Sequence, residues 1–151
     1  MTLTDFIEKV ENIPLQEICK NSVEFNKEEI INVLQYQLFE QSLDGDGNPL
    51  RSPYSSQIGL YGNGKSYKQV KEEMRGKEIT DLYFTGEMFA EMNMNVTDTE
   101  YHITSFVPYT EKLAKWADAP IFELTLENQE SVRLHFLNQT IANQIKEWIA
   151  Q

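Results

Sequence analysis

Apolar and polar residues near the start of the chain recur with the period of a helix. Phe6, Val10 and Ile13 lie three or four positions apart, and Pro14 interrupts the pattern. This spacing places side chains on one face of a helix. We therefore expect one or two short helices in residues 1–25, which would form a helical N-terminal extension.

A longer apolar stripe follows this extension. Ile30, Leu34 and Leu38 recur every four residues, which predicts an amphipathic helix from about residue 27 to residue 41. Asn26 is a candidate N-cap for this helix, because its side-chain oxygen can accept a hydrogen bond from an unpaired amide of the first turn.

The centre of the chain changes from a helical period to a strand period. Thr85 is a candidate N-cap for a short helix. One face of that helix would consist of Met88, Phe89 and Met92. In residues 94–105, apolar and polar positions alternate on either side of a turn at 97–99. This alternation predicts the two strands of a hairpin.

Two further elements are predicted after the hairpin. Residues 109–116 have a helical pattern, which Asp118-Ala119-Pro120 stops. Residues 121–125 alternate between two faces, and this pattern predicts a third strand.

The longest amphipathic pattern lies near the C-terminus. Thr125 or Asn128 can cap a helix of about 24 residues, which is about 35 Å long at 1.5 Å per residue. Its apolar stripe consists of Val132, Phe136, Leu137, Ile141, Ile145, Trp148 and Ile149. A stripe of this length is long for a small sheet to cover. Its outer half is therefore either part of the core or a surface between subunits.

These elements predict a single α+β domain over residues 1–151, with a core at 26–151. A small antiparallel sheet of at least three strands is flanked by long N- and C-terminal helices. Residues 44–81 form a long loop rich in Gly, Asp and Asn, within which only 67–75 have a helical pattern. Loops of this length are typical of functional segments or of segments that a partner orders.

The composition is that of a soluble globular protein, with 40% hydrophobic and 25% charged residues. The net charge of −11 argues against binding to a nucleic-acid backbone or to a membrane surface. The sequence contains neither a signal-peptide pattern nor an apolar run of membrane-spanning length, so we expect a cytoplasmic product. The single cysteine, Cys19, is expected to be a small buried apolar residue.

Residues Gly59–Ser66 match the phosphate-binding loop pattern G-x-x-x-x-G-K-S. In such loops glycine amides surround the phosphate, the lysine neutralises it and the serine holds magnesium. The pattern also needs a buried strand before it and a parallel sheet around it, whereas residues 51–57 are mostly polar. A glycine loop with an exposed lysine is the favoured interpretation, and a small nucleotide-binding protein is the alternative.

Other candidate sites give weaker signals. Residues 44–48 resemble the start of a calcium loop, but Pro49 and Ser55 stand where its glycine and bidentate glutamate belong, so a tight turn is expected. His102 and His135 lack neighbours at metal-ligand spacing. We therefore expect no catalytic, cofactor or metal site, and no enzymatic activity.

Several short motifs resemble a family of bacteriophage proteins. The string Leu82-Tyr83-x-Thr85-Gly86-x-Met88, followed by a hairpin and Val107-Pro108-Tyr109, is similar to the central signature of tail-completion or minor tail proteins of tailed phages. These are also called virion morphogenesis proteins. Upstream, residues 37–40 and 44–50 resemble the family's glutamine-rich helix end and Asp-x-x-Gly turn. The resemblance covers roughly residues 26–150.

The resemblance implies a structural role. The chain would be a subunit of a ring at the neck or upper tail of a phage or prophage, where it joins the head connector to the tail. Its partners would be sister subunits and neighbouring connector and tail proteins. It would be assembled in the bacterial host cytoplasm and reside in the virion, with no membrane contact. DNA would pass only as cargo, without specific binding, through an acidic lumen.

The aromatic residues mostly fall on predicted inward faces, so a role in the core is favoured. For Tyr109 and Trp116, contact with a neighbouring subunit is the alternative.

A thermal-shift assay tests the nucleotide-binding alternative. A ligand at a hundred times its dissociation constant stabilises the folded protein by about 2.7 kcal/mol. We expect ATP or GTP with magnesium to leave the melting temperature unchanged. A magnesium-dependent increase that a Lys65→Ala variant loses would establish the phosphate-binding loop instead.

Overall fold

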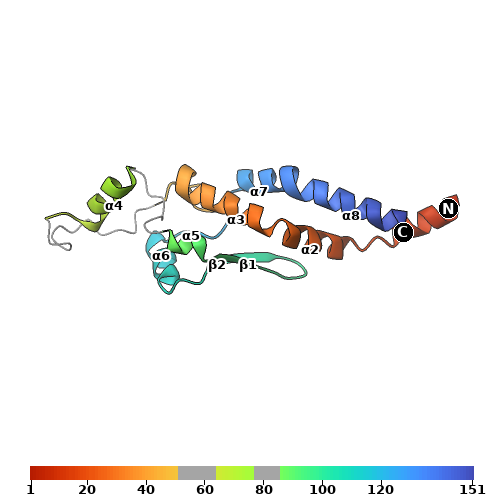
Figure 1. Cartoon of the computed structure of the whole chain (residues 1–151), viewed down its shortest axis with the longest axis horizontal. Helices are drawn as coiled ribbons and strands as arrows, with labels where there is room; N and C mark the ends of the chain where they lie inside the picture. The colour runs from red at the N-terminus through yellow and green to blue at the C-terminus, as the bar shows by residue number, and fades with distance from the viewer. Residues whose placement is uncertain (51–63, 77–85) are drawn as a thin grey trace.

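The computed structural model describes residues 1–50, 64–76 and 86–151 of the chain. The molecule is long and narrow, with both termini at one end and helix α4 at the other (Figure 1). Along the middle of its length it has three layers: the C-terminal helices, the N-terminal helices and a hairpin (Figure 1).

The elements follow one another in this order: α1 (Leu3–Glu11), α2 (Leu15–Phe25), α3 (Lys27–Tyr36), the π-helical turn η1 (Gln37–Gln41), α4 (Tyr67–Arg75), α5 (Glu87–Ala90), β1 (Met92–Val96), β2 (Tyr101–Ser105), α6 (Thr110–Ala117), α7 (Leu126–Val132), the π-helical turn η2 (Arg133–Leu137) and α8 (Asn138–Ala150). The predicted helices at the N-terminus and over residues 67–75 and 109–116 are confirmed.

The predicted helix over residues 27–41 is present as α3 followed by η1. Ile30, Leu34 and Leu38 are fully buried, as their spacing predicted. Asn26 precedes the helix, but its side chain does not cap it. Instead its Nδ2 donates to Ser22 O (2.8 Å) and to Thr140 Oγ1 (2.9 Å). The predicted start of the helix was therefore correct. The predicted N-cap was wrong, because Thr140 on α8 offers the Asn26 side chain a hydrogen-bond acceptor.

A polar cluster between α2 and α8 holds these two helices in register. Ser22 is buried, and its hydroxyl donates to Ile18 O (2.7 Å) and accepts from Gln144 Nε2 (3.1 Å). The Ser22–Gln144 and Asn26–Thr140 bonds pair buried polar groups across the interface between the two helices, where an unpaired polar group would be costly.

The hairpin is confirmed. Strands β1 and β2 are antiparallel, with Met94 opposite Ile103. The side chains buried on its inner face are Met92, Met94, Ile103 and Ser105. This face packs against α2 and α3. Helix α5 precedes the hairpin as a single turn that starts after Gly86, and the predicted cap Thr85 lies outside the described residues.

The prediction of a third strand was wrong. Within the described residues the sheet has two strands, and residues 121–125 form a turn between α6 and α7. The buried apolar side chains of this turn are Ile121 and Leu124. They are three positions apart, whereas side chains on one face of a strand are separated by an even number of positions. The Gln37 side chain bonds two of its backbone groups, Glu123 O and Thr125 N, so these groups need no neighbouring strand.

The amide of Gln37 connects the end of α3 to the start of α7. Its Nε2 donates to Glu123 O (2.9 Å) and Leu43 O (3.4 Å), and its Oε1 accepts from Thr125 N and Asn128 Nδ2 (both 2.9 Å). The side chain is 0% exposed. All of its hydrogen-bonding capacity is therefore used within the core.

Residues 44–48 form the expected tight turn. Asp44 Oδ1 accepts from the amides of Asp46 (3.0 Å) and Asn48 (2.9 Å). Gly45 donates to Pro120 O (3.0 Å), and a Cβ at this position would lie 2.6 Å from Glu123 Cβ. Only glycine allows this turn to pack so closely on the turn before α7. Of the predicted 44–81 loop, the structure describes residues 44–50 and 64–76. Helix α4 lies within the second of these ranges.

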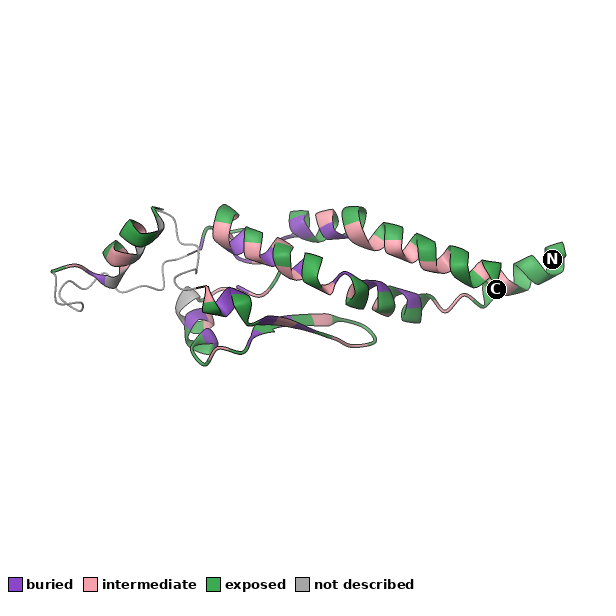
Figure 2. Ribbon diagram, in the orientation of Figure 1, coloured by how far each residue is buried: buried purple, intermediate pink, exposed green. Residues whose placement is uncertain are grey.

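The C-terminal helix is confirmed, with a π-helical turn inside it. Thr125 caps it by accepting from the amide of Asn128 (3.2 Å). Val132 is buried, whereas no residue of α8 is. The stripe on α8 packs mainly against α2 and α1, and it is covered only in part (Figure 2). The fold is thus α+β, mostly helical.

Replacing Gln37 tests the buried amide cluster. Gln37→Leu conserves size but leaves buried backbone and Asn128 groups unpaired, so we expect the free energy of unfolding to fall by about 3 kcal/mol in urea titration. Gln139→Leu, on the exposed side of α8, serves as the control and should change it by less than about 0.5 kcal/mol. Equal stability of the two variants would contradict the structural role of Gln37.

Candidate interaction surface

The part of the Gly59–Ser66 motif that the structure describes is occupied by structural contacts. Ser66 is the N-cap of α4: its hydroxyl accepts from Gln69 N (3.2 Å), and its amide donates to Gln69 Oε1 (2.9 Å). Lys65 Nζ forms an ion pair with Glu73. Residues 59–63 lie outside the described residues. The sheet in the described part of the chain is antiparallel, whereas the motif requires a parallel one.

The candidate metal residues are not brought together. His102 and His135 are both exposed, and His102 Nε2 lies 3.0 Å from Glu100 Oε1. Asp44 uses its carboxylate to close its own turn. In the described ranges, no group of three or more His, Cys, Asp or Glu residues is placed to hold a metal. Cys19 is exposed, contrary to expectation, because on α2 it lies one position from the buried Ile18.

An open groove lies between α2 and the tip of the hairpin. It is lined by Pro14, Leu15, Gln16, Glu17, Lys20, Asn21 and Asp98. Lys20 Nζ forms an ion pair with Asp98 Oδ1 (2.7 Å), and Gln16 Nε2 donates to Asp98 O (3.2 Å). The hydrogen bond from Lys20 and the positive charge of Lys20 lower the pKa of Asp98. The same hydrogen bond and the negative charge of Asp98 raise the pKa of Lys20. These contacts attach the hairpin tip to α2.

Helix α1 exposes a continuous apolar face. Its apolar residues recur at positions 3, 6, 7 and 10, which is one side of a helix, and no residue of α1 is buried. The exposed fractions are 75% for Leu3, 41% for Phe6, 48% for Ile7 and 41% for Val10. In Figure 2 this helix extends past the end of α8. Sequence reasoning noted the helix but not this surface, because the same pattern describes a helix packed in a core.

A second apolar patch lies between β2 and α6. Phe106 is 67% exposed, and Tyr109 nearby is also exposed. Backbone hydrogen bonds from Phe106 N to Glu91 O (3.3 Å) and from Thr110 N to Val107 O (3.1 Å) hold this segment against α5 and α6. Tyr109 is therefore not a core residue, and the Trp116 side chain lies outside what the structure describes.

Comparisons with protein-family models, with curated proteins and with solved structures found no match. Among the described helices, none combines the length and the apolar composition that crossing a membrane requires.

The Lys20–Asp98 contact predicts a measurable shift. The lowered pKa of Asp98 means that the contact stabilises the folded state above the ordinary carboxyl pKa of 3.8, and that this contribution is lost as the pH falls through the folded-state value. In Lys20→Met we expect the pKa of Asp98, measured by NMR titration of its carboxyl carbon, to rise to its ordinary value. In the control Lys146→Met, on α8, it should stay low. A pKa that does not respond to Lys20→Met would disprove the contact.

Proposed function

We propose that this chain is a structural subunit that assembles with copies of itself. The observation that carries this proposal is the open apolar face of α1. The largest contiguous apolar patch on a monomeric soluble protein is typically a few hundred Å², and it is often an interaction site. Removing such a face from water contributes roughly 25 cal/mol of favourable free energy per Å². Contact with another protein surface would provide this stabilisation.

We further propose that the assembly is a ring at the neck or upper tail of a tailed phage or prophage, joining the head connector to the tail. The resemblance of residues 26–150 to tail-completion and minor tail proteins supports this place. The acidic composition also fits a ring around passing DNA, because a negative lumen repels the phosphate backbone and prevents it from binding. The neighbouring connector and tail proteins would be the other partners, in the virion.

Sedimentation velocity over a concentration series tests self-assembly. We expect larger species to appear in the micromolar to millimolar range, and negative-stain electron microscopy to show closed rings among them. A chain that sediments as a monomer throughout this range would disprove assembly with itself.

The place in a virion needs a separate experiment. Phage particles induced from the source cells should contain the chain at a fixed copy number, measured by quantitative mass spectrometry of purified virions. Deletion of its gene should leave DNA-filled heads without attached tails. Normal infectious particles from the deletion strain would rule out the phage role while leaving self-assembly unaffected.

A further inference from the structure

We propose that the outer edge of strand β2 joins two copies of the chain into a symmetric dimer. The two β2 strands lie side by side and antiparallel, so that the two hairpins form one sheet in the order β1–β2–β2–β1. This contact rests on the proposed self-assembly, but it does not use the apolar face of α1. It therefore gives the assembly a second, different surface.

Hydrogen bonds at the two ends of the hairpin show which backbone groups of β2 point outward. Thr97 N donates to Glu100 O (2.8 Å), and Phe106 N donates to Glu91 O (3.3 Å). In an antiparallel pair, such hydrogen-bonded positions alternate with positions whose N–H and C=O groups point away from the partner strand. With the observed register, the outward-pointing groups of β2 are those of Tyr101, Ile103 and Ser105. Among the described residues, none outside the hairpin forms a backbone hydrogen bond with these groups.

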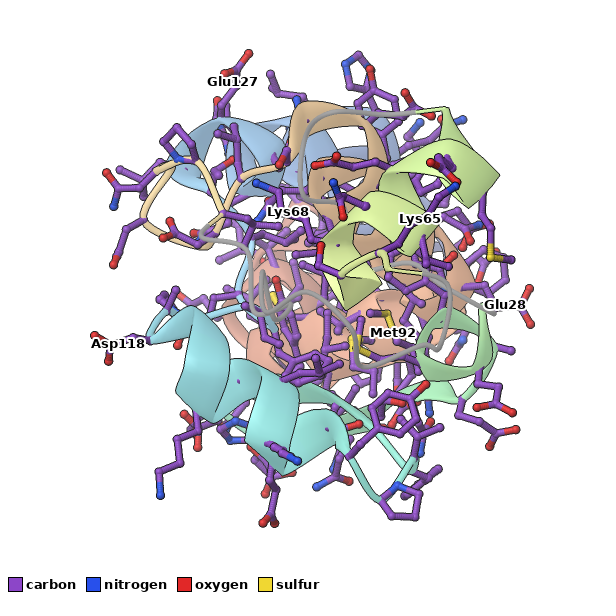
Figure 3. All side chains as sticks on the ribbon, turned by 90° about the vertical axis from the view of Figure 1, so that its left-hand side faces the viewer. Glu28, Lys65, Lys68, Met92, Asp118 and Glu127 are labelled. Atoms are coloured by element: carbon purple, nitrogen blue, oxygen red, sulfur yellow. The ribbon has the colours of Figure 1, made fainter. Side chains whose placement is uncertain are left out.

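The helices pack on the other strand of the hairpin. Helices α2 and α3 contact β1, whereas the main contacts of β2 are with β1. Figure 3 shows Met92 of β1 near the middle of the molecule and the charged residues that it labels at the periphery, namely Glu28, Asp118 and Glu127. In the described part of the chain, the sheet ends at β2. An exposed strand edge of this kind is a template for pairing with another strand.

The sequence of β2 favours such pairing. Natural edge strands are protected by lysines, prolines or bulges, whereas residues 101–105 contain no Lys, Arg, Asp, Glu, Pro or Gly and pair with β1 in a regular register. Their Tyr, Ile and Thr are residue types that strands prefer. Strand β1 has two asparagines among five residues, and asparagine is depleted in strands. The edge of β2 is therefore the better template.

This edge is complementary to itself. When two copies pair antiparallel with Ile103 opposite the same residue of the second copy, Tyr101 lies opposite Ser105. All of these residues point their N–H and C=O groups at the second copy, so each opposed pair exchanges two hydrogen bonds. A register shifted by two residues leaves one of these positions in each strand without a partner in the other strand. The self-pairing register thus uses the whole edge, which selects a second copy as the occupant.

The side chains that this register places opposite one another are compatible. His102 lies opposite Thr104, both on the exposed face of the sheet, so no like charges meet between the two β2 strands. Within each copy, His102 Nε2 already lies 3.0 Å from Glu100 Oε1. Phe106, which is 67% exposed, lies diagonal to His102 of the second copy. The contact therefore covers part of an aromatic side chain that a single copy leaves in water.

The helices of the two copies have room beside each other. In the joint sheet the two β1 strands are three strand spacings apart, which is about 14 Å. A helix with its side chains is about 10–12 Å wide. Helices α2 and α3 follow one another along the hairpin (Figure 1) and contact β1, so each copy places a single helical row over its own β1. The two rows lie next to each other on one face of the sheet.

The contact is closed, because both copies use the same surface. Copies joined only through β2 stop at the dimer, and larger species need the α1 face as well. An edge of five residues is a small surface, at the low end of specific interfaces. The dimer therefore dissociates readily, and its formation depends on concentration.

Sedimentation equilibrium tests this dimer in a chain without the α1 face. An arm variant carries Phe6→Ser and Ile7→Ser, both at exposed positions. We expect it to form dimers, and nothing larger, between micromolar and millimolar concentration. Adding His102→Lys and Thr104→Lys places lysine opposite lysine in two pairs, which should weaken the dimer by roughly two- to thirty-fold.

Two further variants of the arm variant check the register. Asn93→Lys with Asn95→Lys adds the same charge to the same face of the sheet, but on β1, and should leave the dimer unchanged. His102→Lys with Thr104→Glu places unlike charges opposite each other in both pairs, and should tighten the dimer by roughly two- to thirty-fold. Circular dichroism checks that each variant is folded.

Amide hydrogen exchange, measured by NMR in the arm variant, locates the contact. As the concentration rises, we expect slower exchange at the amides that the second copy would pair, those of Tyr101, Ile103 and Ser105. The outward-pointing amides of β1 are the matched control, and exchange should not change at Met92, Met94 and Val96.

The outcomes separate this inference from the proposed function. An arm variant that stays monomeric while the wild type associates overturns the β2 contact and leaves assembly through α1 standing. A dimer that the lysine pair on β2 does not weaken, or in which the β2 amides do not respond, also overturns the β2 contact. If the wild type and the arm variant both stop at a β2 dimer, this inference stands and the role of α1 is overturned. A wild type that is monomeric throughout overturns both.

Discussion

The side chain of Gln37 holds together the parts of this fold that are distant in sequence. One primary amide can donate two hydrogen bonds and accept two, and here it joins the end of α3, the loop at Leu43, the turn before α7 and α7 itself. The backbone groups of that buried turn need partners, and the amide supplies them where a neighbouring strand otherwise would. Helix α7 thereby starts beside the end of α3, and the C-terminal helix runs back along α2.

This arrangement concentrates the core in one half of the molecule. The hairpin covers α2 and α3, and α7 closes the other side, so the fully buried residues gather there (Figure 2). Towards the termini only two helices remain, joined by the Ser22–Gln144 and Asn26–Thr140 bonds, and α1 lies beyond them. Two helices cannot cover each other's apolar stripes completely. A chain with this shape can bury the remaining apolar face by adding another copy.

Local pattern predicted most of the helices and the hairpin, because the side chains of these elements face the core with a regular period. Ile30, Leu34 and Leu38, or Met94 and Ile103, show that period directly. The local pattern failed at residues 121–125. Five alternating residues fit a strand there, but the side chain of Gln37, which is distant in sequence, forms hydrogen bonds with their backbone. The cap at Asn26 failed for a similar reason, since Thr140 lies 114 positions away. The apolar face of α1 could be seen in the sequence, but its exposure could not.

The sequence by itself determined most of the helices and the hairpin, because period, proline, glycine and capping residues act over a few positions. Only the tertiary structure decided which faces are covered, since burial depends on partners distant in the chain. Leu3 and Phe6 have the pattern of core residues, and they are surface residues because the two-helix layer ends where Trp148 meets Lys9.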